Sequence, residues 1–355
     1  MSTYRLDRSF VWNFEHGPMH NGGFRSIPKT PLKEFFGLPT YSKFGVAASV
    51  IVNERWLETY SRLGFDLLTY KSVRLIERRC HAFPNWVFVD GDVFENSTST
   101  NGVLVKRHRR NLNLLQATGA GSFGMPSKSP SFWLNDIRNS RSKILDGQVL
   151  IVSVVATPRS NMSKHEIAEE YGILAQMVIE AGAQVVEANL SCPNVTTGEG
   201  ELYADSEMVC EISNNLRKNS GRTPITLKLG HISDDELLTS VLRAANDSVD
   251  GVVLMNGINK RVIDKNGNPA FSSGRETCGI TGAGIHKIAL NYVRRAIDIV
   301  ARENLSLKII ANGGVVSPES AKSFFDTGAY AVTSASGAVF DPQLALSIKT
   351  CHPEW

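Results

Sequence analysis

One short segment of the chain concentrates side chains that can do chemistry. Residues 187–194 read Glu-Ala-Asn-Leu-Ser-Cys-Pro-Asn, after an apolar run. Asn189 and Asn194 can each donate and accept hydrogen bonds, which suits a planar polar ring that carries both donors and acceptors. Between them, Cys192 can act as a base when it is a thiolate. A single cysteine is more often a small buried hydrophobe, so this interpretation depends on what the rest of the chain places nearby.

Other polar or small residues stand within or just after further apolar runs. Lys71 and Lys228 each interrupt such a run, and a buried ammonium group is costly without an electron-rich partner. Asn256 follows another run, and the pairs Gly313-Gly314 and Ala335-Ser336 follow two more. Small residues allow a phosphate to approach the backbone closely. Taken singly, Lys228 could reach solvent and the glycine pair could be an ordinary turn. Together they indicate a site for FMN, which joins a phosphate to an electron-accepting ring.

The elements that would position these residues are repeated βα units. Short apolar runs alternate with helical patterns, which is typical of a parallel sheet buried on both faces. Eight runs qualify as strands, the number that a closed barrel needs: residues 44–49, 67–73, 149–156, 185–191, 225–229, 251–256, 307–311 and 330–334. The sequence therefore predicts an α/β fold, a single (β/α)8 TIM barrel with its site at the carboxyl ends of the strands.

Capping signals support the intervening helices. Ser163 and Glu166 have capping-box spacing, and Gly182 follows as a stop signal. Ser233 and Glu236 repeat that spacing before a second helix. Ser317 precedes a proline at the first helical position of a third.

Three regions do not fit a minimal barrel. Residues 1–43 are polar and aromatic, and are predicted to be an N-terminal extension packed on a barrel that spans 44–355. Residues 74–146 are too long for one crossover, so we expect an insertion over the carboxyl-terminal face, with 96–101 as a loop tip. Residues 258–279 are predicted to be a long loop of the kind that forms lids.

Composition excludes several classes of protein. The 355 residues are 42% hydrophobic and 21% charged with a net charge of +3, values typical of a soluble globular protein without a nucleic-acid surface. The basic run 106–110 is predicted to be a solvated loop. No run has the length of a membrane span, and the five scattered cysteines have no metal-site spacing. An odd number of cysteines fits a reducing compartment, so we expect a cytoplasmic protein without bound metal.

The order of these motifs resembles the dihydroorotate dehydrogenase family. The chain looks most like its soluble, cysteine-based class and is similar to the flavin domain of dihydropyrimidine dehydrogenases. The segments that carry the resemblance are Gly-Val-Ala-Ala-Ser (45–49), Leu-Thr-Tyr-Lys-Ser-Val (68–73), Asn-Leu-Ser-Cys-Pro-Asn-Val (189–195), Leu-Lys-Leu (227–229), Gly-Ile-Thr-Gly-Ala-Gly-Ile (279–285) and Asn-Gly-Gly (312–314). It covers roughly residues 44–345 and is densest from 147 onward.

The resemblance implies an FMN-dependent oxidoreductase that acts on a CH–CH bond of a small cyclic, amide-like substrate, nominally dihydroorotate, and a homodimer. Cys192 would be the catalytic base. Substrate would be bound by Lys71, Asn189, Asn194 and Asn256. FMN would be bound by Ala47, Ala48, Ser49, Lys71, Ser72, Asn189, Lys228, Gly257, Gly282, Gly313, Gly314, Ala335 and Ser336. The electron acceptor is not readable, because the sequence shows no motif for NAD or an iron–sulfur cluster.

Two positions depart from the family pattern. Gly121 stands where the family usually has Asn, and Gly257 stands where it has Ser or Thr; both are substrate contacts in the family. An alternative is therefore a specialised relative that acts on another ring, such as a dihydropyrimidine or a natural-product intermediate. A third hypothesis is a flavin- or phosphate-binding barrel without catalysis, or a partner subunit, against which Cys192 and Lys228 argue.

Overall fold

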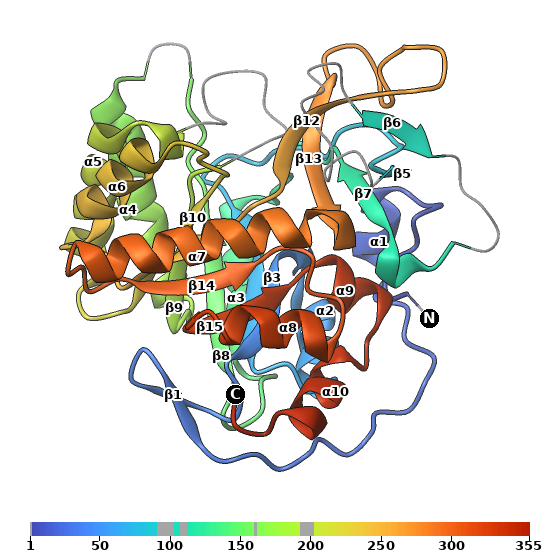
Figure 1. The fold of residues 1–355 in the computed structure, drawn as a ribbon, viewed down its shortest axis with the longest axis horizontal. Coiled ribbons are helices and arrows are strands. Elements are labelled where there is room, and N and C mark those ends of the chain that lie inside the picture. The colour runs from blue at the N-terminus through green and yellow to red at the C-terminus, as the bar shows by residue number, and fades with distance from the viewer. Residues whose placement is uncertain (1, 91–102, 107–111, 160–161, 192–201) are drawn as a thin grey trace.

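The centre of the molecule is the predicted closed barrel of eight parallel strands (Figure 1). The computed structural model describes residues 2–90, 103–106, 112–159, 162–191 and 202–355. The barrel strands follow one another in chain order around the ring. They are β3 (Phe44–Ile51), β4 (Leu67–Val73), β8 (Val149–Val154), β9 (Val185–Asn189), β10 (Ile225–Leu229), β11 (Gly251–Leu254), β14 (Lys308–Asn312) and β15 (Ala331–Ser334).

All eight strands were predicted, and β4 and β10 have the predicted bounds. The runs were readable because nearly every residue in them is buried, as in a parallel sheet that is covered on both faces. The helices that cover the outside are α2 (Glu54–Arg62), α3 (Pro130–Arg141), α4 (Lys164–Glu180), α5 (Ser206–Ser220), α6 (Asp235–Ala245), α7 (His286–Arg302), α8 (Pro318–Phe325), α9 (Ser336–Phe340) and α10 (Leu344–Cys351).

Two of the three predicted helix starts are confirmed. Ser163 and Glu166 form a capping box at α4, and Ser317 caps α8. The prediction for Ser233 was wrong, because α6 is capped one residue later by Asp234, whose carboxylate accepts a 2.7 Å hydrogen bond from the Leu237 N–H. Aspartate is as good an N-cap as serine, so spacing alone did not separate the two.

A second, smaller barrel covers the carboxyl ends of the large one (Figure 1). It consists of β12 (Ile258–Ile263), β13 (Thr277–Gly282), β7 (Thr118–Gly121), β5 (Trp86–Val89) and β6 (Val103–Lys106), in that order. The prediction of one long loop over 258–279 was therefore wrong at both ends, which are strands, while residues 264–276 between them are a loop. Ile258 and Val262 are buried around a more exposed Lys260, a strand pattern that the intervening charges obscured. The loop tip predicted at 96–101 and most of the basic run at 106–110 lie outside the described residues.

The N-terminal segment contacts both ends of the barrel. Near the small barrel, the Thr3 N–H donates to the Val339 carbonyl at 2.9 Å, and Thr3 Oγ1 lies 2.7 Å from Tyr60 Oη. Helix α1 (Phe10–His16) follows, and the chain then runs to the opposite end, where β1 (Lys33–Phe35) and β2 (Leu38–Thr40) form a hairpin (Figure 1). There the fully buried Phe35 packs among barrel residues that include Leu67 and Val149.

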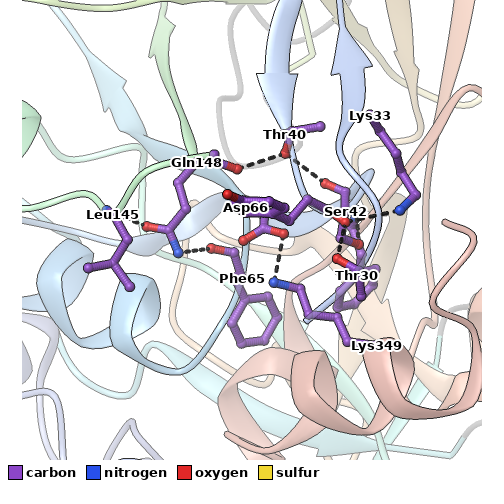
Figure 2. A network of polar contacts seen from close by, with 12 residues as sticks. Thr30, Lys33, Thr40, Ser42, Phe65, Asp66, Leu145, Gln148 and Lys349 are labelled. Carbon is purple, nitrogen blue, oxygen red and sulfur yellow. Dashed lines mark hydrogen bonds and ion pairs between the residues drawn. The ribbon is translucent and has the colours of Figure 1, made fainter. Parts of the chain in front are cut away.

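A buried ion pair holds α10 to the amino-terminal end of the barrel (Figure 2). Lys349 Nζ lies 2.7 Å from Asp66 Oδ2, and the two side chains are only 3% and 2% exposed. Gln148 Nε2 donates to the Phe65 carbonyl at 3.0 Å beside this pair. Lys33 donates to the Pro353 carbonyl at 2.8 Å, so the hairpin is also tied to the C-terminal residues. This network lies at the opposite end of the barrel from the small β-barrel.

Candidate active site

A cavity lies between the carboxyl ends of the barrel strands and the small barrel, and most of the predicted site residues line it. Those that do are Ala47, Ala48, Ser49, Lys71, Asn189, Lys228, Asn256, Gly257, Gly282, Gly313, Gly314, Ala335 and Ser336. Ser72 is buried beside the cavity and lines an adjoining pocket. Cys192 and Asn194 lie outside the described residues, so their predicted roles stay predictions.

Lys228 is the most telling residue of the cavity. It sits on β10 between apolar neighbours, is 3% exposed, and lines the cavity. Among the described residues, no hydrogen bond and no ion pair within 4 Å meets its ammonium group, and the carboxyl group that interacts with it, Glu187, lies diagonally across the strand pair. A buried ammonium with only this more distant compensation is costly. The arrangement therefore favours an electron-rich ligand in the cavity.

Two amide side chains are held in place beside Lys228. In the β9–β10 pairing, Asn189 lies directly opposite Lys228. Asn189 Oδ1 accepts the Ser191 N–H at 3.1 Å, and Asn189 Nδ2 lies 3.4 Å from Ser72 Oγ. Asn256 Nδ2 donates to the Ser191 carbonyl at 2.6 Å. These contacts fix the amide planes, which is what recognition of a planar polar ring requires.

Glycines line another part of the cavity. Gly313 and Gly314 follow β14 with φ values of 140° and 66°, and Gly282 ends β13 with φ 96°. A Cβ atom on Gly313 would come within 2.5 Å of Ala289 Cβ, and one on Gly282 within 2.4 Å of the Ala117 carbonyl oxygen. Only glycine fits these positions, and its bare backbone allows a ligand to approach closely.

The two departures from the family pattern have a structural reason. A Cβ atom on Gly257 would lie 2.9 Å from the Ile280 carbonyl oxygen, closer than side chains tolerate. At Gly121 the added Cβ would lie 3.2 Å from the Phe123 ring. Gly121 also pairs with Gly279 across β7 and β13. At Gly257 the small barrel thus leaves no room for a side chain, whereas at Gly121 a side chain fits if the Phe123 ring shifts by a few tenths of an ångström.

Aromatic residues complete the cavity, and sequence reasoning missed them. The cavity is also lined by Tyr4, Phe10, Trp56, Trp86 and Phe123. Lys71 Nζ lies 5.8 Å from the centre of the Phe10 ring, within cation–π range. The aromatic content of the N-terminal segment was visible in the sequence. Its place beside the site depends on tertiary contacts that no local pattern encodes.

Two cysteines near the site are poorly suited to act as a base. Burial raises the pKa of Cys80 to about 11, although Lys71 and Arg275 favour its thiolate. Burial likewise raises the pKa of Cys278, on β13, to about 12. Both are therefore thiols at neutral pH. The remaining described cysteines, Cys210 and Cys351, are exposed on the helices α5 and α10.

The described residues include neither a candidate metal site nor a candidate membrane span. Across these ranges, no group of three or more His, Cys, Asp or Glu side chains is placed to hold a metal ion. Every helix that the structure describes is too short or too polar to cross a bilayer.

Comparison with known proteins assigns the family. The sequence model of the family described as dihydroorotate dehydrogenase matches residues 33–350. A protein from Dictyostelium discoideum named dihydroorotate dehydrogenase is 33% identical over 357 aligned positions, covering 97% of this chain and 95% of the relative. The chain belongs to the dihydroorotate dehydrogenase family.

Two further members of the family illustrate its range. The catalytic subunit of dihydroorotate dehydrogenase B (NAD(+)) from Maridesulfovibrio salexigens is 29% identical over 184 residues, covering 51% of this chain and 57% of that protein. The crystal structure of DHODH from Eimeria tenella in complex with ferulenol is similar to this chain, with a TM-score of 0.70 and 15% sequence identity. The similarity covers 92% of this chain and 85% of that one. At this identity the superposition supports the fold alone.

Proposed function

We propose that this chain is an FMN-dependent dihydroorotate dehydrogenase, which oxidises the CH–CH bond of dihydroorotate to give orotate. The observation that carries the proposal is Lys228, a buried cation that faces the cavity without a hydrogen-bond or ion-pair partner among the described residues. The near full-length similarity to a dihydroorotate dehydrogenase supports the substrate. The alternative of another ring substrate is not favoured, because the relative that covers nearly the whole chain is named dihydroorotate dehydrogenase.

The residues present fit FMN. Lys228 supplies a cation for the electron-rich edge of a flavin ring. Gly282, Gly313 and Gly314 supply backbone that a phosphate or ribityl chain can approach, and Ala335 and Ser336 lie on the same wall. When bound, FMN would supply the hydride acceptor that the oxidation of a CH–CH bond requires.

The chain's own residues would bind the substrate and move the proton. Asn189 and Asn256, fixed by their hydrogen bonds, would bind the ring amides together with Asn194 and Lys71. Cys192 would remove the proton from a ring carbon, which requires a thiolate within reach of that carbon. Cys80 and Cys278 are poorly suited to this role, because burial raises the pKa of each thiol.

Flavin content and orotate binding test the proposal. We expect purified protein to release FMN on denaturation, and orotate titration to perturb the flavin absorbance with saturation. A protein that stays colourless after incubation with FMN would contradict the cofactor. A flavoprotein with no response to orotate would contradict the substrate.

A cysteine substitution tests the base. We expect Cys192→Ala to retain FMN and orotate binding and to lower turnover at neutral pH by about 100-fold or more, the typical contribution of a positioned base. The matched control is Cys210→Ala, because Cys210 is an exposed cysteine on α5. Equal turnover in both variants would remove Cys192 from the mechanism.

The proposal also covers the location, the oligomeric state and the electron acceptor of the enzyme. The four described cysteines are free, which supports a cytoplasmic location. The resemblance to the soluble class supports a homodimer, which light scattering of the purified protein would test. The electron acceptor is a small molecule or another protein, and a screen of acceptors against the reduced enzyme would identify it.

A further inference from the structure

The carboxyl group of Glu187 is buried inside the barrel, below the residues that line the cavity. Glu187 is on β9, two residues before Asn189 on the same face of the strand, and is 4% exposed. The β9–β10 register places it opposite Thr226, diagonal to Lys228. Diagonal neighbours lie roughly 7 Å apart between Cα atoms, within reach of long side chains. The carboxyl group therefore lies under the cation that faces the cavity.

The contacts of Glu187 leave it incompletely satisfied. Its Oε1 atom is buried and accepts no hydrogen bond from any residue the structure describes. Burial raises the pKa of Glu187, while Lys228 and Ser153 each favour its charged form. An unsatisfied buried carboxyl group costs free energy, so a well-packed barrel interior would not contain one for stability alone.

Hydroxyl groups connect Glu187 to the amide at the cavity. Ser153 on β8 lies opposite Glu187 in the strand register. Ser153 Oγ is 2.8 Å from Ser72 Oγ, which lies 3.4 Å from Asn189 Nδ2. These side chains are all buried. Glu187 thus lies beneath both groups proposed to meet FMN, diagonal to Lys228 and connected to Asn189 through the hydroxyl groups of Ser153 and Ser72.

We propose that Glu187 is a positioning residue that sets how strongly the Lys228 charge acts on bound FMN. This inference rests on the proposed function. A carboxylate beneath Lys228 would offset part of the positive charge that Lys228 presents to the cavity. Removing that charge leaves the cation fully available to the cavity. The reduced flavin, which carries more negative charge, then gains more affinity than the oxidised flavin.

The test is the ratio of the dissociation constants of oxidised and reduced FMN, obtained by fluorescence titration of apoprotein and from the flavin midpoint potential. We expect Glu187→Gln to shift this ratio about tenfold toward the reduced form. That is the order expected for one unit charge at about 10 Å and an effective dielectric constant of about 20. A tenfold shift is about 30 mV for a two-electron couple.

Two further variants separate charge from packing. Glu187→Asp keeps the charge but shortens the side chain, and we expect it to keep the wild-type ratio. Glu170→Gln removes a different buried carboxylate, on α4, whose Oε1 accepts the Thr157 N–H at 2.8 Å. We expect no change in the ratio for this control.

The outcomes are distinguishable from failure of the proposed function. If wild-type protein does not bind FMN, the proposed function fails and this inference falls with it. If the wild type binds FMN and oxidises dihydroorotate, an unchanged ratio in Glu187→Gln would overturn this inference alone. A shift in Glu187→Asp as large as that in Glu187→Gln would also overturn it, because packing would then be the cause.

Discussion

Replacing Lys349 with methionine is a direct test of how the C-terminal helix is held to the barrel. Lys349 and Asp66 are 3% and 2% exposed and their charged atoms are 2.7 Å apart (Figure 2). Lys349→Met leaves the Asp66 carboxylate buried without its cation. Breaking a buried pair in this way typically costs about 3–5 kcal/mol, a large part of a stability of roughly 5–15 kcal/mol. We expect a loss of unfolding free energy in that range.

The matched control is an exposed pair of the same type. Lys322 on α8 and Asp326 at its C-cap lie 2.6 Å apart but are 50% and 56% exposed, so Lys322→Met should cost at most about 1 kcal/mol. Urea denaturation at neutral pH measures the unfolding free energy of both variants. Their midpoints can be compared directly if the dependence of that free energy on urea concentration is unchanged. FMN affinity of the folded protein should not change in either variant, since both pairs lie away from the cavity. Equal losses of unfolding free energy in the two variants would show that burial does not set the strength of the Lys349–Asp66 pair.

Three other substitutions test the titration of Asp66, the space at Gly257 and the role of Lys228. Burial raises the pKa of Asp66 to about 6 from an ordinary 3.8, so between these pH values the folded protein holds a proton that the unfolded chain releases. The stability from this group therefore falls as pH rises from about 4 to 6, by about 2 kcal/mol of the roughly 3 kcal/mol lost over the whole titration. Urea titrations across that range should show this slope in the wild type, and its persistence in Asp66→Asn would contradict the assignment. Gly257→Ser should weaken orotate binding rather than improve it, because the added Cβ meets the Ile280 carbonyl oxygen at 2.9 Å; tighter binding by titration would show that the position has room. Lys228→Met should raise the FMN dissociation constant about 10- to 100-fold, the range for a hydrogen bond to a charged group, and unchanged fluorescence titration would exclude its role.

The large barrel could be predicted because its strands are apolar on both faces and bounded by turn and capping signals. The small barrel could not. Strand β7 reads Thr-Gly-Ala-Gly and is only four residues long, so it has neither apolar length nor alternation. Its partner β13 is more than 150 residues away in the sequence and pairs Gly121 with Gly279. Such strands form because distant segments meet over the barrel, which local patterns do not report.

The part of the site that lies at the carboxyl ends of the barrel strands could be predicted from the sequence. Lys228, Asn189 and Asn256 converge because the carboxyl ends of parallel strands meet in a closed barrel. The aromatic wall was missed because Tyr4 and Phe10 come from the N-terminal segment. Glu187 was also passed over, although it opens the most informative motif of the chain. Its meaning depends on the register that sets it diagonal to Lys228.

Anaerobic mixing of the purified FMN-loaded protein with dihydroorotate is the sharpest test of the proposed oxidation. We expect the visible absorbance of the flavin to be lost in one turnover, with one orotate formed per FMN, and we expect Cys192→Ala but not Cys210→Ala to slow this step. Flavin that stays oxidised at saturating dihydroorotate, in protein that binds FMN and is folded, would contradict the proposed oxidation.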